Sequence, residues 1–289
     1  MDTIQNHKAE LFVALQRLLP KHTLSRLIAR LAESKQPWLK NFLIRQAIRK
    51  FDINLLEAFS SDLNDYENFN AFFTRALSPE ARTVASEPLG IISPADGMVS
   101  QIGHIHENRI IQAKGIDYSP AHLLGNSIEA ELFADGTFTT IYLSPRDYHR
   151  VHIPFSGKLL GARYIPGELF SVNDQTAQCL PGLFTRNERL VCQFEGDIGK
   201  FSVILVGAML VAGIETVWGG FESPNPGTVR ETDFSDQELV FSKGDEIGRF
   251  KFGSTVILLF QNQMSTWSDD IYPGSNLRMG ELIGNKINT

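Results

Sequence analysis

Large aliphatic residues in the N-terminal part of the chain recur at the spacing of an amphipathic helix. Four of them between residues 24 and 31 fall at positions i, i+3, i+4 and i+7, and residues 39–47 repeat the pattern. Proline begins or ends a helix, so Pro20 and Pro37 divide this region into about three helices. A helix-like pattern continues over residues 52–77.

After Pro79 the pattern changes to short β-branched or aromatic runs, separated by glycine and proline. The runs are residues 109–112, 138–143, 190–194, 201–206 and 256–260. Such spacing is typical of a β domain with many turns. The sequence therefore predicts an α+β fold, in which an amphipathic helical subdomain of residues 1–75 lies on a mostly antiparallel β domain of residues 76–289.

Charge divides the chain at a similar place. The formal net charge is −6, but residues 11–50 carry nine Lys and Arg against one acid, which makes this segment +8 and the remainder −14. Basic amphipathic helices with an interfacial aromatic such as Trp38 lie well on anionic lipid. The alternatives are a solvated basic face and a nucleic-acid surface; the acidic remainder, without a recognised nucleic-acid motif, argues against the latter.

Composition bears on membrane spanning, disulfides and metal binding. The longest uncharged run, residues 201–214, is shorter than the ~20 residues that a membrane-spanning helix needs. Cys179 and Cys192 without a secretory leader give no reason to expect a disulfide framework, so a reducing compartment is expected. No metal-binding motif is present, and none is expected to be needed.

Gly253-Ser254-Thr255 stands directly before five apolar residues that indicate a buried strand. A glycine carbonyl lies just behind the Ser254 hydroxyl, and glycine permits strained backbone dihedrals and close approach. This arrangement suits attack by the Ser254 oxygen on the preceding peptide bond. Taken alone, however, the stretch fits a turn glycine and a structural serine at the start of a strand better, since Gly-Ser-Thr is common.

Two other sites contain chemically useful side chains. Asp96 lies on a predicted turn, Ser-Pro-Ala-Asp-Gly, and His149 and His152 follow a predicted strand that ends at residue 143. Aspartate on such a turn usually bonds its own backbone, and a lone histidine is most often structural. Asp96, a histidine and Ser254 nevertheless supply the parts of a nucleophilic triad. No Gly-x-Ser-x-Gly elbow surrounds Ser254, which argues against an ordinary hydrolase.

In their order along the chain, these motifs resemble the bacterial phosphatidylserine decarboxylases, pyruvoyl enzymes that cleave themselves at a Gly-Ser bond. The resemblance covers nearly the whole chain, and its motifs are Phe-Asn-x-Phe-Phe-Thr-Arg at 69–75, Ser-Pro-Ala-Asp-Gly at 93–97, Tyr-His-Arg-Val-His at 148–152, Ile-Glu-Thr-Val-Trp at 214–218 and Gly-Ser-Thr at 253–255. The family usually has leucine before Gly-Ser-Thr, where this chain has Phe252.

The resemblance implies a role for each matching residue. Ser254 attacks the Gly253 carbonyl, with His152 as general base and Asp96 as the carboxylate that orients it. Elimination and hydrolysis then release ammonia and leave a pyruvoyl group at position 254, with chains 1–253 and 254–289. The pyruvoyl carbonyl forms a Schiff base with the substrate, a task that pyridoxal phosphate performs elsewhere. His149 is implied as proton donor in decarboxylation, and Tyr148 as a residue of the substrate pocket.

The implied reaction converts phosphatidylserine in a bilayer to phosphatidylethanolamine, without metal or pyridoxal phosphate. The resemblance also implies a peripheral protein on the cytoplasmic side of the cell membrane. Its two self-cleavage chains are expected to stay associated, and a homodimer is possible. Three alternatives remain open at this point. They are a pyruvoyl decarboxylase of a free amino acid, a Ser-His-Asp hydrolase that keeps Ser254 intact, and a lipid-surface adaptor without catalysis.

Overall fold

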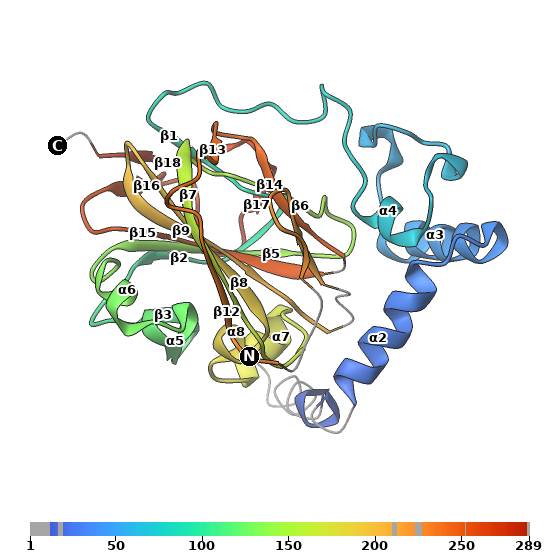
Figure 1. The fold of residues 1–289 in the computed structure, drawn as a ribbon, viewed down its shortest axis with the longest axis horizontal. Helices are drawn as coiled ribbons and strands as arrows, with labels where there is room; N and C mark the ends of the chain where they lie inside the picture. The colour runs from blue at the N-terminus through green and yellow to red at the C-terminus, as the bar shows by residue number, and fades with distance from the viewer. Residues whose placement is uncertain (1–11, 17–19, 210–212, 223–226, 252, 288–289) are drawn as a thin grey trace.

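The computed structural model describes residues 12–16, 20–209, 213–222, 227–251 and 253–287. A helical arm lies beside a β-rich body, as Figure 1 shows. The arm contains α2 (Lys21–Ala32), α3 (Pro37–Phe51), two 3-10 helices (Leu55–Glu57 and Leu63–Asp65) and α4 (Phe69–Phe73). The helices predicted on either side of Pro37 are confirmed, and Pro37 occupies the first turn of α3, where its missing N–H breaks no helical hydrogen bond.

The expected continuation of helix over residues 52–77 is largely wrong. Asp52 ends α3 in a left-handed conformation (φ 55°, ψ 52°), and the chain beyond it consists of loops, two 3-10 turns and the five-residue α4. Asn54 and Asp62 accept hydrogen bonds from backbone N–H groups two residues ahead. Such local side-chain bonds compete with helix formation, which is why the apolar pattern did not produce a longer helix here.

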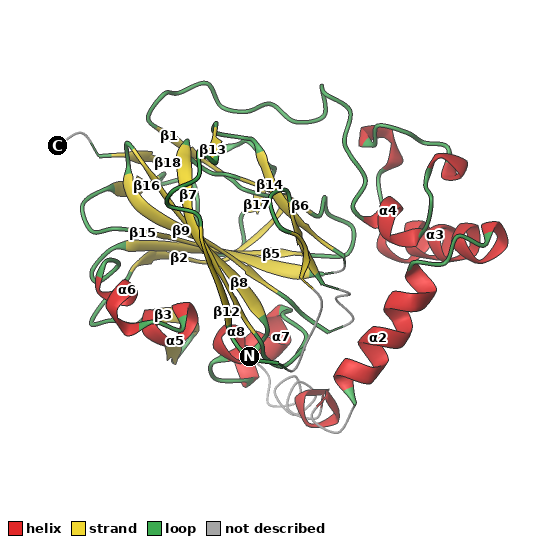
Figure 2. Ribbon diagram, viewed as in Figure 1, coloured by secondary structure: helices red, strands yellow, loops and turns green. Residues whose placement is uncertain are grey.

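The body consists of antiparallel strands, shown in yellow in Figure 2. The large sheet contains, in spatial order, β12 (Arg230–Asp233), β7 (Gly157–Ile165), β8 (Arg189–Gly196), β9 (Gly199–Val206), β15 (Ser254–Phe260), β5 (Thr137–Leu143), β2 (Gly97–His104) and β17 (Asn276–Leu277), and β13 (Val240–Phe241) also pairs with β7. A second sheet contains β11 (Gly220–Glu222), β10 (Ile214–Thr216), β14 (Glu246–Phe250) and β6 (Arg150–His152). The predicted α+β class is confirmed.

Smaller elements complete the body. A three-stranded sheet is formed by β1 (Gly90–Ile92), β18 (Leu282–Lys286) and β16 (Ser265–Trp267), and β3 (Ile110–Ala113) pairs with β4 (Ile116–Tyr118). The short helices of the body are α5 (Pro120–Leu124), α6 (Ser127–Glu131), α7 (Asp174–Cys179) and α8 (Leu183–Arg186). The five apolar runs predicted from the sequence lie mainly within β3, β5, β8, β9 and β15.

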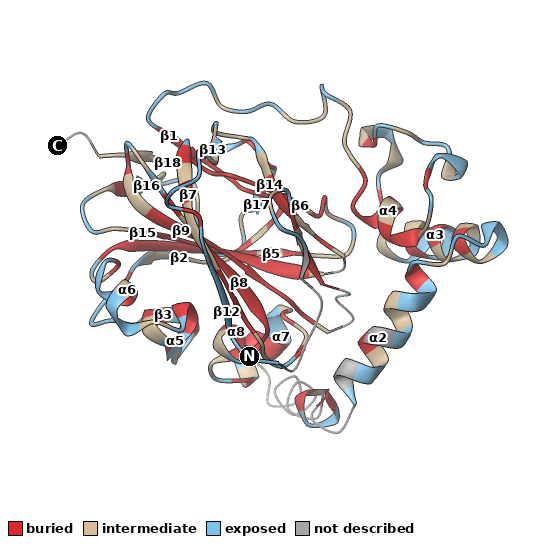
Figure 3. Cartoon of the chain, in the orientation of Figure 1, coloured by how far each residue is buried: buried red, intermediate tan, exposed pale blue. Residues whose placement is uncertain are grey.

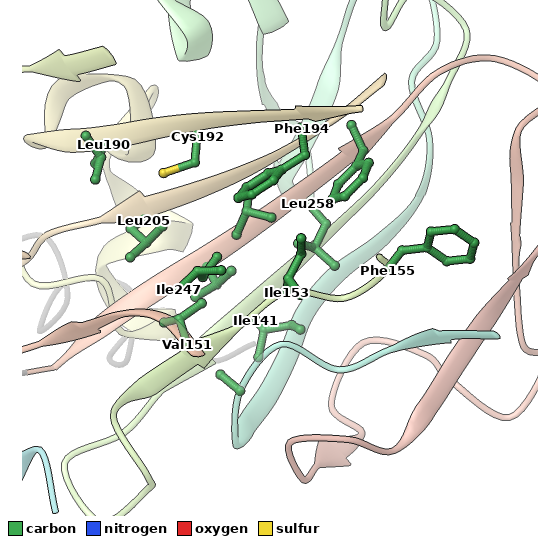
Figure 4. Close-up of a cluster of buried hydrophobic side chains, with 14 of the residues drawn as sticks. Ile141, Val151, Ile153, Phe155, Leu190, Cys192, Phe194, Leu205, Ile247 and Leu258 are labelled. Atoms are coloured by element: carbon green, nitrogen blue, oxygen red, sulfur yellow. The ribbon is translucent and has the colours of Figure 1, made fainter. Parts of the chain in front are cut away.

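Alternate residues of the central strand β15 enter two different hydrophobic cores. Val256 and Leu258 join a cluster that includes residues of the second sheet, such as Val151 and Ile247 (Figure 4). Ile257 instead joins the cluster on the opposite face of the large sheet, which includes residues of α5 to α8. A strand covered on both faces is apolar throughout, so the run after Ser254 has no polar alternation.

The helical arm has a third core of its own, built from residues between Ala32 and Phe73. It meets the body through polar contacts, among them Arg150 Nε, which donates to Thr74 O at 2.9 Å, and an ion pair of Arg82 with Glu57. Separate cores suit the predicted subdomain boundary near residue 76, which stays a prediction. Cys179 and Cys192 form no disulfide.

Candidate active site

One end of the large sheet brings the predicted site residues together. Ser254 begins β15 and pairs with Leu143, the last residue of β5. Gly97, which follows Asp96, begins β2, and the adjacent pair Met98–Tyr142 aligns β2 with β5. Asp96 and Ser254 therefore lie at the same edge, with the end of β5 between them. The predicted turn at Asp96 and the predicted strand start at Ser254 are both confirmed.

Two of the connections between the large sheet and the second sheet carry or border site residues at this edge. The segment after Leu143 leads from β5 to β6 and carries His149, whereas the segment before Ser254 leads from β14 to β15. Because β6 pairs with β14 and β5 pairs with β15, the two connections run between the same two pairs of strands. His149 is tied to the second connection, since its carbonyl accepts from Phe250 N at 2.9 Å.

Ser254 is fully buried, and its hydroxyl has no hydrogen-bond partner among the described residues. A buried hydroxyl without a partner costs free energy, so its persistence at a strand end calls for an explanation other than folding. Glycine permits strained dihedrals at position 253, but the φ of Gly253 lies outside the left-handed region. Among the described residues, an added Cβ would meet only Leu143 O, at 3.8 Å. Phe252 lies outside the described residues.

His149 is fully buried beside Phe73, with 4.2 Å between ring centroids. Its Nδ1 lies 2.8 Å from the Asp147 carbonyl oxygen, which can only accept, so Nδ1 carries the proton. Nε2 then has a lone pair, and it has no partner in the described part of the chain. Burial lowers the pKa of His149 to about 3, against the opposing effect of the Asp147 carbonyl. At neutral pH this imidazole is therefore uncharged, and its Nε2 can accept a hydrogen bond.

His152 is buried as well, but both of its nitrogens have partners. Nδ1 donates to Gly244 O at 2.7 Å, so Nε2 accepts from the Tyr148 hydroxyl at 3.0 Å. Burial lowers the pKa of His152, partly offset by its bond to Gly244. Burial also raises the pKa of Tyr148, which keeps its proton on the phenol. The hydrogen bond from Tyr148 must open before Nε2 of His152 can accept a proton from any other group.

A backbone hydrogen bond joins His152 to the turn that carries Asp96, but the Asp96 carboxylate bonds to residues other than His152. His152 N donates to Pro94 O at 2.8 Å, which joins β6 to the Asp96 turn. The Asp96 carboxylate accepts from Arg82 Nε and from Met279 N, both at 2.8 Å, and forms a second bond to Arg82 Nη2. The structure therefore gives Asp96 an arginine partner, and no direct bond from its carboxylate to His152.

Sequence reasoning missed several residues of this site. Arg82 lies in a segment without a recognisable pattern, and its pairing with Asp96 depends on how that segment crosses the sheet end. Arg75 ends the motif at residues 69–75, and no role was predicted for it. Its side chain is nevertheless 4 % exposed, and its Nε and Nη1 have no partner among the described residues. A buried arginine without a carboxylate partner is rare, and the Phe-Phe-Thr-Arg run was the available signal.

Three adjoining hollows lead from the helical arm to this edge. A cavity of about 290 Å³ is lined by residues that include Arg75, Asp96 and Tyr148. Arg146 also lines it, and Arg146 and Lys50 line a neighbouring cavity of about 420 Å³. Lys50 in turn borders a groove of about 330 Å³ between α2 and α3, whose walls are mostly apolar.

Two further observations describe the surroundings of the site. Among the described residues, no group of three or more His, Cys, Asp and Glu side chains is placed to hold a metal ion. None of the helices in the described ranges is long and apolar enough to cross a lipid bilayer.

Comparison with known proteins identifies the family. A family model described as phosphatidylserine decarboxylase matches residues 69–285, and a second, described as PSD, matches residues 11–52. A phosphatidylserine decarboxylase proenzyme from Alcanivorax borkumensis is 51% identical, over 95% of this chain and 96% of that protein. Proteins of the same name from Ectopseudomonas mendocina and Saccharophagus degradans are each 48% identical, over 96% of this chain and 99% and 97% of theirs. The chain therefore belongs to the phosphatidylserine decarboxylase family.

Proposed function

We propose that this protein converts phosphatidylserine to phosphatidylethanolamine with a pyruvoyl group that it makes from Ser254 by cutting its own Gly253–Ser254 bond. The observation that carries the proposal is the buried Ser254 hydroxyl without a partner, at the sheet edge shared with Asp96 and the two histidines. Family membership favours this activity over a free-amino-acid decarboxylase, a hydrolase or an adaptor. The pyruvoyl group supplies an electron sink for the carbanion left by loss of CO₂.

The residues around Ser254 fit the formation of such a group. Within the described part of the chain, the hydroxyl has no hydrogen bond to lose when it leaves its rotamer. His152 is the base that takes the hydroxyl proton once the bond from Tyr148 opens. Asp96 acts on His152 through the backbone contact at Pro94 and through its negative charge, which favours the protonated imidazole. The cut leaves chains 1–253 and 254–289 held together by the strand pairs of β15 with β5 and β9.

His149 is the proton carrier for the decarboxylation itself. It rests uncharged, and its Nε2 has no partner among the described residues. It would take the proton that the ammonium group of the substrate gives up on entering the site, and return that proton to the substrate carbon after CO₂ has left. Tyr148 forms part of the pocket wall, in the same cavity as Arg75. Burial of these groups excludes water, which would otherwise compete for the same proton.

The three adjoining hollows fit a phospholipid that enters from the helical arm. The apolar groove between α2 and α3 suits an acyl chain, and the cations next to it suit a phosphodiester. Lys50 and Arg146 are exposed at this junction, and Arg75 is the buried cation beyond it. We assign the phosphate to Lys50 and Arg146, with Arg75 nearest to the serine headgroup.

Neutralising the phosphate-binding cations should weaken substrate binding without affecting self-cleavage. We expect Lys50→Gln with Arg146→Gln to raise KM for dispersed short-chain phosphatidylserine about tenfold or more, since charge-assisted hydrogen bonds contribute about 1.5–3 kcal/mol. Lys114→Gln changes an exposed lysine away from the site and is the matched control. An unchanged KM in the double variant would place the phosphate elsewhere.

The helical arm presents an apolar and basic face that fits an anionic bilayer. Leu27 and Phe42 are 55% and 54% exposed, and Trp38 is 72% exposed. Figure 3 shows exposed residues in pale blue along α2 and α3. The cations Arg30, Arg45, Arg49 and Lys50 are exposed on the same two helices, whereas Lys40 is buried and donates to the carbonyls of Leu63 and Tyr66. We therefore place the protein on the cytoplasmic leaflet of the cell membrane, held by apolar burial and by these cations.

This membrane contact should have a salt-sensitive part and a salt-resistant part. Replacing Arg26, Arg30, Arg45 and Arg49 by Gln should lower binding to anionic vesicles and activity on bilayer substrate, yet leave self-cleavage intact; the Arg26 side chain is outside the described residues. Each cation near the surface contributes about 1 kcal/mol, and screening to ~3 Å in 1 M salt should remove that part alone. Vesicle sedimentation across a salt series measures both. Salt-insensitive binding that the four changes do not alter would contradict this orientation.

The reaction itself is tested on the purified protein. Intact mass should show two chains, with the second lacking the amine of residue 254, and CO₂ release should require phosphatidylserine. Free serine offered at the same concentration should release far less CO₂, because it has no phosphodiester for Lys50 and Arg146. A single intact chain, or equal rates with free serine, would favour the hydrolase or the free-amino-acid decarboxylase.

A further inference from the structure

A buried carboxyl group lies two strands away from Ser254, at the same edge of the large sheet, and none of the chemistry above uses it. Glu188 directly precedes β8 and is 1% exposed. Its Oε2 accepts a hydrogen bond from the Tyr164 hydroxyl at 3.0 Å, whereas Oε1 has no partner in the described part of the chain. A carboxyl oxygen left without a partner in a core is costly for folding, so a chemical role has to be considered.

Strand register places Glu188 level with Ser254. Val206 of β9 pairs with the residue after Ser254 on one side and with the residue after Glu188 on the other. One residue further toward the edge, Gly207 therefore lies between Ser254 and Glu188, and Gly207 N donates to Glu188 O at 2.9 Å. Residues that are level across a sheet project to the same face, so the three share the face that Val256 occupies.

The glycine between them leaves room for the carboxyl group. A Cβ on Gly207 would lie 2.9 Å from both Cγ and Oε1 of Glu188, so the carboxyl fills the space of the missing side chain. Cβ positions opposite each other on neighbouring strands are about 4.5–5.5 Å apart. Oε1 of Glu188 thus lies over Gly207 of the middle strand, on the face of the sheet toward which the Ser254 side chain projects. The Ser254 hydroxyl also has no partner among the described residues.

No cation balances Glu188 among the described groups packed around it. Within the described residues, Tyr164 is the one side chain that bonds the Glu188 carboxyl. The cations of the neighbouring elements contact other groups. Arg163 pairs with Glu129 and Glu231, Arg249 with Glu246 and Lys251 with Glu215, whereas Arg189 donates to the carbonyls of His122 and Leu123 and Arg230 lies over the Tyr164 ring. A backbone bond joins the two glutamates, from Glu188 N to Glu168 O at 2.9 Å. Burial therefore raises the pKa of Glu188 to about 7, against the opposing Tyr164 bond.

We propose that Glu188 donates the proton that the Ser254 nitrogen needs when the Gly253–Ser254 bond breaks. This role rests on the proposed self-cleavage, in which the Ser254 oxygen forms a bond to the Gly253 carbonyl carbon and gives its proton to His152. The carbon–nitrogen bond then breaks, and the nitrogen takes a proton from the Glu188 carboxyl. Solvent returns the His152 proton to the Glu188 carboxylate, so one proton has moved from oxygen to nitrogen overall.

The test is the pH dependence of self-cleavage in newly made protein. Wild type and Glu188→Gln are made by cell-free translation and transferred to buffers between about pH 6 and 9, where uncut chain is followed on denaturing gels. The donor must be protonated, so the wild-type rate should fall as pH rises through about 7. Glu188→Gln keeps the shape and the Tyr164 bond but cannot donate, so we expect cleavage about 100-fold slower and without that fall.

Two further variants separate a chemical role from a structural one. Tyr164→Phe removes the hydrogen bond that lowers the pKa of Glu188, so the fall in rate should move to higher pH. Glu195→Gln changes an exposed glutamate at the far end of β8 and should leave rate and profile unchanged. A Glu188→Gln chain that cuts like wild type, or a wild-type rate that does not fall with pH, overturns the role of Glu188 alone. A wild-type chain that never cuts overturns self-cleavage as well.

Discussion

Ser254→Ala should yield one uncut chain with no decarboxylase activity, since both the nucleophile and the precursor of the pyruvoyl group are lost. The fold should survive, because the hydroxyl makes no hydrogen bond to any described residue and its loss leaves no partner unsatisfied. A denaturing gel and CO₂ release from phosphatidylserine vesicles measure the two effects. We expect complete loss of both cleavage and activity, together with a cooperative melting transition that shows a folded chain.

The matched control for this experiment lies in the same sheet. Ser202 on β9 is also fully buried, and its hydroxyl likewise has no partner among the described residues. Ser202→Ala therefore reproduces the packing change at a site without the chemistry, and it should cut and decarboxylate normally. Two fragments from Ser254→Ala, or an uncut Ser202→Ala chain, would contradict a specific role for the Ser254 oxygen.

Local pattern predicted the elements of this fold better than it predicted their contacts. The runs that became β5, β9 and β15 are apolar because both faces of the large sheet are covered, and such runs are visible in a single sequence. The helices around Pro37 were equally visible. The segment after Asp52 was misread because local side-chain bonds, not periodicity, decide its conformation.

The positions of the site residues depend on register, which no short stretch of sequence reveals. Ser254 and Asp96 share an edge because β5 pairs with both of their strands, and Glu188 joins them only through the alignment of β8, β9 and β15. The Asp96–Arg82 ion pair depends on where the segment that carries Arg82 crosses the sheet edge. The burial of Lys40 depends on how α3 packs against the loop that contains Leu63 and Tyr66. Motif resemblance supplied the names of the reactive residues but not these neighbours.

His152 and His149 should separate two steps of the chemistry. We expect His152→Ala to leave most of the chain uncut, because the base near Ser254 is gone, and a general base contributes about 10²–10⁴-fold. His149→Ala should cut but release CO₂ more slowly by a similar factor, since the free Nε2 that carries the substrate proton is lost. Tyr148→Phe, which frees Nε2 of His152, should still cut. Cleaved fraction and CO₂ release are measured for each variant; an uncut His149→Ala chain beside a cut His152→Ala chain would exchange the two roles.

Asp96→Asn completes this comparison, and its expected loss of cleavage has two distinct physical sources. Asparagine removes the charge that favours protonated His152, but it also removes the main partner of Arg82, and breaking a buried pair costs about 3–5 kcal/mol of folding free energy. Glu57→Gln removes the other acid that bonds Arg82 and leaves the Asp96 turn unchanged. If Asp96 acts on the chemistry, Asp96→Asn should slow cleavage far more than Glu57→Gln at equal loss of thermal stability. Equal slowing by both variants would mean that Asp96 acts only by holding Arg82.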